Sequence, residues 1–147
     1  MDVLDRKILN IMQKNSRITV KQIAEECFIS SPSVSVRLQN LEGLGYIRTY
    51  QAILDHQKLG FLIKAYVNCA VPAKDKKDFY RYIEEIPNVV ECDCITGDYS
   101  MLLKVYYSNT IELDEFINDL QRFGDTKTHI VFSTNVGPRG LQIQVNE

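Results

Sequence analysis

The sequence predicts an α+β protein, in which three short helices in a helix-turn-helix arrangement precede a sheet domain of ferredoxin-like β-α-β-β-α-β order. Apolar residues first recur at helical spacing, and the period changes to that of strands after Gly60. The chain has 147 residues, 45% of them hydrophobic and 24% charged, which indicates a globular protein with room for two small domains. We therefore expect domains at 1–50 and 61–147, joined by a linker strand and turn at 51–60.

The first two helices are predicted by apolar periodicity and by a capping signal. Residues 3–14 carry leucine, isoleucine and methionine at helical spacing, as one face of an amphipathic helix requires. In the second helix, Thr19 is the expected N-cap, and Gln22 follows three residues later. This spacing is that of a capping box, in which each side chain accepts from the other residue's backbone N–H.

The third helix is predicted in the stretch SPSVSVRLQNLEGLGY. Ser30 or Ser31 is the expected cap, with Pro32 at the first helical position, where a missing N–H costs nothing. Gly43 and Gly45 mark the end of the helix. Because a short turn separates the second helix from this one, the pair has the helix-turn-helix pattern.

The opposite edges of this third helix differ in chemistry. Val34, Leu38 and Leu41 form one aliphatic stripe, which we expect to pack inward. The outward edge is small and hydrogen-bonding, which suits a helix that enters the DNA major groove, whereas a merely solvated edge is usually rich in glutamate and lysine. Basic side chains nearby are candidates for phosphate contacts. The predicted DNA-binding residues are Lys21, Ser31, Pro32, Ser33, Ser35, Val36, Arg37, Gln39, Asn40 and Arg48.

The remaining elements are predicted by alternating and helical periods between turn signals. A strand is expected in YIRTYQAIL before the linker turn, and another in PRGLQIQV near the C-terminus. Between them, the tight turn GDYS joins two strands as a hairpin. The expected strands of the second domain are 61–71, 88–96, 100–107 and 127–136, with helices at 73–86 and 109–123.

Two helices cover only one face of such a sheet, so the other face must be hidden by something else. Tyr66, Val105 and Tyr107 are expected to offer apolar surface there, and the run 130–132 is too apolar for a strand that is wet on one side. These residues predict pairing with a second copy of the chain. Dimers of helix-turn-helix proteins read two half-sites about one helical turn apart, which agrees with the first domain.

At this point the chain resembles the Lrp/AsnC family, the feast/famine transcription regulators. The resemblance rests on stretches that follow in order along the sequence: LDRKIL, ITVKQIAE, SPSVSVRLQNLEGLGYI, YQAILDHQKLG, VVECDCITGDYSMLLKV and TKTHIV. It implies a winged helix-turn-helix, a ligand-sensing second domain, and homodimers that assemble further, commonly into octamers. It also implies double-stranded DNA as the partner and a free amino acid as the effector.

The resemblance further implies an effector site at the hairpin and before the last strand. A zwitterion needs N–H donors for its carboxylate and acceptors for its ammonium group, although the same hairpin read alone is an ordinary turn. Ser100 stands where the family typically has an aspartate, so effector-independent DNA architecture stays open as the alternative function. The implied effector residues are Gly97, Asp98, Tyr99, Ser100, Thr126 and Thr128.

Other function classes find little support in the sequence. No Ser/His/Asp order, phosphate-cradling glycine loop or paired histidines point to an enzyme, and no cofactor is expected. Cys92-x-Cys94 lacks metal-site spacing, so no metal is expected, and the cysteines are interpreted as reduced, buried thiols. No apolar run approaches the roughly 20 residues that span a bilayer, and the N-terminus lacks a secretion signal, so we expect a cytoplasmic protein without membrane contact. Residues 1–50 carry seven Lys/Arg against five Asp/Glu within a chain of net charge −2, which permits a local phosphate-binding surface.

Overall fold

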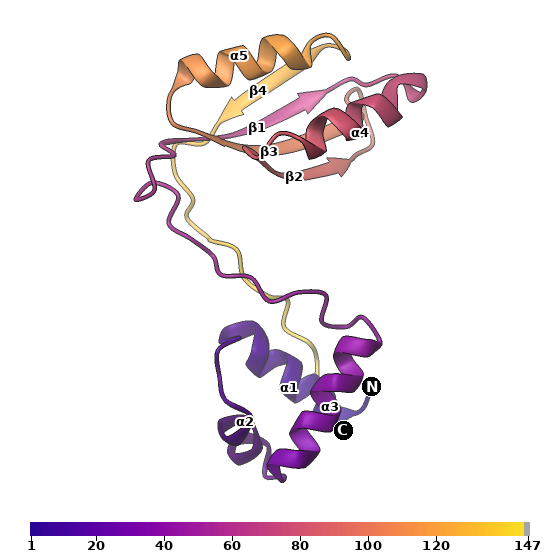
Figure 1. Cartoon of the computed structure of the whole chain (residues 1–147), viewed down its shortest axis with the longest axis vertical. Helices are drawn as coiled ribbons and strands as arrows, with labels where there is room; N and C mark the ends of the chain where they lie inside the picture. Colours follow the sequence, from indigo (N-terminus) through magenta and orange to yellow (C-terminus); the bar gives the residue numbers. More distant parts are fainter. Residues whose placement is uncertain (146–147) are drawn as a thin grey trace. The chain divides into compact units, whose positions relative to one another are not determined.

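The computed structural model describes residues 1–145, which form two compact units (Figure 1). The N-terminal unit contains residues 1–53 together with the C-terminal segment 136–145. The sheet unit contains residues 54–135. The sequence-based boundaries placed the C-terminal segment in the second domain, whereas the structure packs it with the first.

Capping boxes start the first two helices of the N-terminal unit. Asp2 caps the first helix, since its side chain accepts from Asp5 N–H at 2.8 Å while the Asp5 carboxylate accepts from Asp2 N–H at 2.9 Å. Thr19 and Gln22 form the predicted reciprocal pair at the second helix, where Gln22 N–H donates to the threonine hydroxyl. The three helices are α1 (Val3–Lys14), α2 (Val20–Cys27) and α3 (Ser31–Gly43).

Ser30, rather than Ser31, caps α3 by accepting from Ser33 N–H. The chain turns away after α3 at Gly45, whose φ of +76° is a left-handed conformation that favours glycine. One hydrophobic cluster holds the three helices together. Its buried members are Ile8, Leu9, Ile23, Ala24, Cys27, Val34 and Leu41.

The C-terminal segment lies along α1 and is held there by side chains of that helix. The Asn10 amide donates to the Ile143 carbonyl at 2.8 Å and accepts from the Ile143 N–H at 2.9 Å, so one side chain satisfies both backbone groups. Gln13 donates to the Leu141 carbonyl, and the Ile143 side chain packs on the helical core. The strand predicted in PRGLQIQV is therefore wrong within the described residues, since side chains rather than a neighbouring strand pair with this backbone.

The strand predicted in YIRTYQAIL, together with its continuation into the linker 51–60, is also wrong. In the described structure, 46–54 is irregular, and 56–60 forms turns. Alternation of apolar and polar side chains does not make a strand unless a second strand offers its backbone groups. Instead of pairing with another strand, this segment makes a local side-chain contact, in which the Tyr50 hydroxyl donates to the Glu42 carboxylate at 2.7 Å.

The described part of the sheet unit contains one antiparallel four-stranded sheet in the order β2-β3-β1-β4 (Figure 1). This order and the β-α-β-β-α-β sequence of elements confirm the predicted ferredoxin-like topology. A short 3-10 turn, η1 (Ala73–Asp75), precedes the first helix of the unit. The elements are β1 (Ile63–Cys69), α4 (Lys76–Glu84), β2 (Val89–Cys94), β3 (Met101–Tyr107), α5 (Thr110–Leu120) and β4 (Thr126–Ile130).

Both helices cover the same face of this sheet, because side chains of α4, α5, β1 and β3 share one buried cluster. Val105 and Tyr107 belong to that cluster, so their expected place on the opposite, open face was wrong. Tyr66 does lie on the open face, since its register partner is Lys104. On the same face the His56 ring stacks on Tyr106, with ring centroids 3.9 Å apart, so the linker turn itself covers part of it.

The four cysteines are free thiols with different exposure. Cys27 and Cys69 are buried, Cys92 is half-buried and Cys94 is exposed, so the expectation of buried thiols fails at Cys94. Burial raises the pKa of the Cys69 and Cys92 thiols to about 11. No helix within residues 1–145 is long and apolar enough to cross a membrane.

We expect Asn10→Ala to lower the free energy of unfolding of the N-terminal unit by about 1–3 kcal/mol, since it removes both hydrogen bonds to Ile143. Urea unfolding of the whole chain, followed by helical circular dichroism, measures this loss. Gln39→Ala, which alters an exposed residue of α3, is the matched control. Equal stability of the two variants would show that the two Asn10 bonds to Ile143 do not stabilise this unit.

Candidate functional site

The two edges of α3 differ in burial as the sequence predicts. Val34 is fully buried and Leu41 is 2% exposed, whereas Val36 on the other edge is 56% exposed. The outward side chains carry no charge, apart from Arg37 at their margin. Of the predicted DNA-binding residues on α3, those with exposed side chains are Pro32, Val36, Gln39 and Asn40, and those half-buried are Ser31, Ser33, Ser35 and Arg37.

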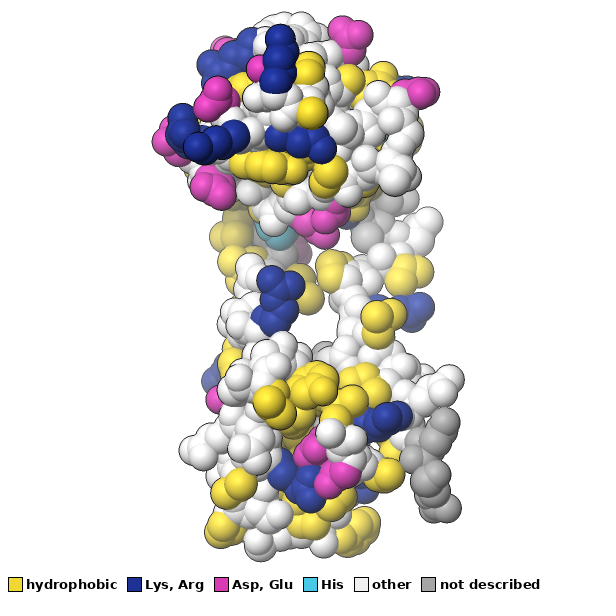
Figure 2. All heavy atoms as spheres, turned by 90° about the vertical axis from the view of Figure 1, so that its right-hand side faces the viewer, with side chains coloured by type: hydrophobic (Ala, Val, Ile, Leu, Met, Phe, Trp, Pro, Cys, Tyr) yellow, Lys and Arg dark blue, Asp and Glu magenta, His cyan; other side chains and the backbone are white. Residues whose placement is uncertain are grey.

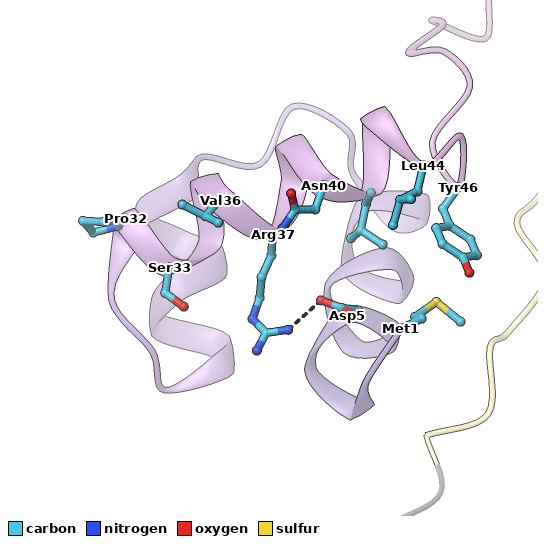
Figure 3. Close-up of a pocket in the computed structure, with 10 residues that line it drawn as sticks. Met1, Asp5, Pro32, Ser33, Val36, Arg37, Asn40, Leu44 and Tyr46 are labelled. Carbon is cyan, nitrogen blue, oxygen red and sulfur yellow. Dashed lines mark hydrogen bonds and ion pairs between the residues drawn. The ribbon is translucent and has the colours of Figure 1, made fainter.

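A groove of about 610 Å³ lies between this outward edge and the start of α1 (Figure 3). Its α3 wall includes side chains that the sequence predicts to read bases. The rest of its lining was not predicted: Met1 and Asp5 lie at the start of α1, and Leu44 and Tyr46 follow the end of α3. The capping spacing of Asp2 and Asp5 could have located the start of α1, although nothing local indicates that it faces α3. Figure 2 shows hydrophobic side chains gathered beside acidic and basic ones on one face of this unit.

Arg37 points toward α1, where Figure 3 shows its bond to Asp5, and it also pairs with the carboxylate of Asp2. Its Nη1 donates to Asp2 Oδ2 at 2.7 Å and to Asp5 Oδ1 at 2.6 Å. Bonds to Asp5 and then Asp2 raise the pKa of Arg37, while the Asp5 N–H and then the guanidinium lower the pKa of Asp2. Arg37 was predicted to contact a DNA phosphate, whereas in this structure its partners are the carboxylates of Asp2 and Asp5.

Of the other predicted DNA-binding residues, two cations lie on the surface, whereas the hydroxyl of Ser35 is bonded within its own helix. Lys21 on α2 and Arg48 after α3 are exposed. The Ser35 hydroxyl, by contrast, donates to the Ser31 carbonyl one turn earlier at 3.2 Å, so its proton is already used within the helix.

The residues implied for effector binding come together at one end of the sheet unit. Register pairing places Cys94, Met101, Cys69 and Thr126 in one row across the four strands. The hairpin loop 95–100 continues from the first two of these residues, and it contains exposed Gly97 at φ +108°. The hairpin loop and the start of β4 therefore lie on either side of the end of β1. Asp98 is exposed, whereas Tyr99 is half-buried and Thr128 is half-buried opposite Val67.

Ser100 fixes this hairpin to β1. Its hydroxyl accepts from the Val71 N–H and donates to the Val71 carbonyl, both at 2.9 Å, while its backbone N–H donates to the Cys69 carbonyl. Because these bonds use the hydroxyl proton, Ser100 serves a structural role here. Gly124 approaches the same place from the other side, where a Cβ would come within 2.0 Å of the Ala70 carbonyl oxygen.

Each half of the chain matches the model of a known protein family. A winged helix-turn-helix DNA-binding model matches residues 1–48, and the Lrp/AsnC ligand-binding-domain model matches residues 64–140. The regulator LrpC of Bacillus subtilis is 31% identical over 133 residues, which cover 90% of this chain and 92% of the relative. The regulator FL11 of Pyrococcus horikoshii is 28% identical, with 98% and 97% coverage.

Solved structures give the same fold. The structure of B. subtilis LrpC superposes with a TM-score of 0.88 at 30% identity, and the alignment covers 94% of this chain and 99% of the other. The complex of regulator NMB0573 from Neisseria meningitidis with L-Met gives 0.89 at 23% identity, with 99% and 97% coverage, a level that supports the fold alone. These folds and relatives are those of transcriptional regulators and not of enzymes. The chain thus belongs to the Lrp/AsnC family of helix-turn-helix transcriptional regulators, with a winged DNA-binding half and a ligand-binding half.

Proposed function

We propose that the protein is a sequence-specific DNA-binding regulator whose α3 enters the major groove. The observation that carries this proposal is the contrast between the two edges of α3. One edge is buried in the helical core, and the other presents exposed, uncharged side chains that are small or can hydrogen-bond. Gln39 and Asn40 can each pair with an adenine through two hydrogen bonds, and Val36 can pack on a thymine methyl group.

Positioning on DNA requires phosphate contacts in addition to base contacts. Lys21 and Arg48 are exposed cations on elements that flank α3, and we assign them this role. Two copies of the chain would present two copies of α3 to successive major grooves, as dimers of helix-turn-helix proteins do. We further infer that the sheet unit supplies this homodimer and higher assemblies such as an octamer.

The same proposal gives the sheet unit an amino-acid effector. The loop around Gly97 offers backbone N–H groups for a carboxylate, while Asp98 and the Thr126 and Thr128 hydroxyls offer acceptors for an ammonium group. Two structurally similar regulators, from N. meningitidis and Mycobacterium tuberculosis, were solved with L-methionine, at 23% and 22% identity. An effector could change assembly or DNA affinity only through unequal affinity for two states of the protein.

A second candidate function is DNA architecture without an effector. Ser100 favours this alternative, because its hydroxyl is bonded to the backbone of Val71. The hairpin then offers an ammonium group one carboxylate, that of Asp98. The two candidates share the DNA-binding role of α3 and differ only in whether a small molecule alters it.

Substituting Gln39 or Asn40 by alanine should reduce discrimination between the preferred and a mismatched duplex by about 1–3 kcal/mol for each bidentate pair lost. Titrations of both duplexes at one fixed salt concentration measure this difference. Asn118→Ala, on the exposed surface of α5, is the control and should leave it unchanged. An equal loss of affinity on both duplexes would instead mark these residues as positioning contacts.

Adding each of the twenty amino acids should change the particle mass or the DNA affinity for at least one of them, and Asp98→Asn should abolish that response because it removes the proposed ammonium partner. Light scattering and DNA titration measure the two quantities. Asp114→Asn, on exposed α5, should respond as the original chain does. If no amino acid has any effect, the architectural function replaces the effector-responsive one.

A further inference from the structure

Arg37 is the cation at the margin of the proposed base-reading edge, yet its charge is directed at the start of α1. Its Nη1 lies 2.7 Å from Asp2 and 2.6 Å from Asp5, and its side chain is only 26% exposed. The two carboxylates also cap α1 through their reciprocal bonds to each other's backbone N–H. The guanidinium of Arg37 therefore joins α3 to Asp2 and Asp5, the two residues of the α1 capping box.

The position of these carboxylates matters because of what lies beside them. Asp5 and Arg37 line the same groove as Ser33, Val36 and Asn40, which belong to the proposed base-reading edge. Any duplex that contacted this edge would bring phosphates close to both carboxylates. Exposed charges act on each other over about 8–10 Å in physiological salt, so carboxylates without a cation would oppose DNA binding.

We propose that Arg37 is a positioning residue for DNA binding and not a phosphate contact. It neutralises Asp2 and Asp5 at the margin of the reading edge and holds the start of α1 against α3. If Arg37 contacted a phosphate instead, Asp2 and Asp5 would be left without a cation next to the DNA. Their negative charge would then oppose binding. This role rests on the proposed function, since it concerns how α3 approaches a duplex.

A charge-rescue cycle tests this role with four proteins: the original chain, Arg37→Gln, the double variant Asp2→Asn/Asp5→Asn, and the triple variant that combines them. Asparagine accepts the same capping bonds as aspartate, so the double variant removes charge while it keeps the start of α1. Duplex DNA affinity is measured over a range of salt concentrations, at a temperature where circular dichroism shows every variant to be folded.

Arg37→Gln should weaken DNA binding about tenfold in the original background, because it leaves two carboxylates without a cation. The same substitution should have less than about a twofold effect in the Asp2→Asn/Asp5→Asn background, and should leave the slope of log affinity against log salt unchanged there. Arg37→Lys should retain most of the affinity, since one ammonium group can also bridge the two carboxylates. Arg48→Gln, a proposed phosphate contact, is the control and should cost the same affinity in both backgrounds.

Three results would overturn the proposal. An equal loss from Arg37→Gln in both backgrounds, with the salt slope smaller by about 0.9, would make Arg37 a phosphate contact. No loss in either background would leave it without a role in DNA binding. Failure of the original chain to bind any duplex would instead remove the proposed function, which separates that outcome from the first two.

Discussion

Burial of the aliphatic edge of α3 is the constraint on which the account of this protein depends. Val34 and Leu41 are packed among side chains of α1 and α2, and each such burial contributes about 1.5–3 kcal/mol relative to exposure. The helix is thereby held without help from the uncharged side chains of its outward edge. That edge is free to carry small, uncharged side chains, which contribute little to folding but suit the edges of bases. The same packing sets α3 beside the start of α1, and so brings Arg37 to Asp2 and Asp5.

Features that depend on local chemistry could be predicted from the sequence. Two such local patterns are present in the structure: the capping box of Thr19 and Gln22, and the glycine at which the chain leaves α3, Gly45. The strand order followed from the β-α-β-β-α-β sequence of elements, because few topologies satisfy it. Which edge of α3 faces outward was predictable for a similar reason: the helical period alone separates inward from outward positions.

Features that depend on distant partners could not be predicted. The segment 46–54 alternates like a strand but finds no ladder among the described residues. β3 carries apolar side chains on both faces, but Lys104 lies with Leu102 and Tyr106 on the face away from the helices, so this lysine was a signal in the sequence that Val105 and Tyr107 face the helices. Arg37 pairs with residues 35 and 32 positions earlier, and Ser100 with a residue 29 positions earlier, distances at which sequence spacing carries no information.

In the proposed function, the uncharged edge of α3 lies against bases in two successive major grooves. Selection of bound duplexes from a random pool, at moderate salt and without added amino acids, measures this most directly. The expected result is enrichment of a sequence with two related half-sites whose centres lie about one helical turn apart. Recovery of an unenriched pool, with equal affinity for every duplex, would contradict the claim, because it would mean that the protein contacts only the phosphate backbone.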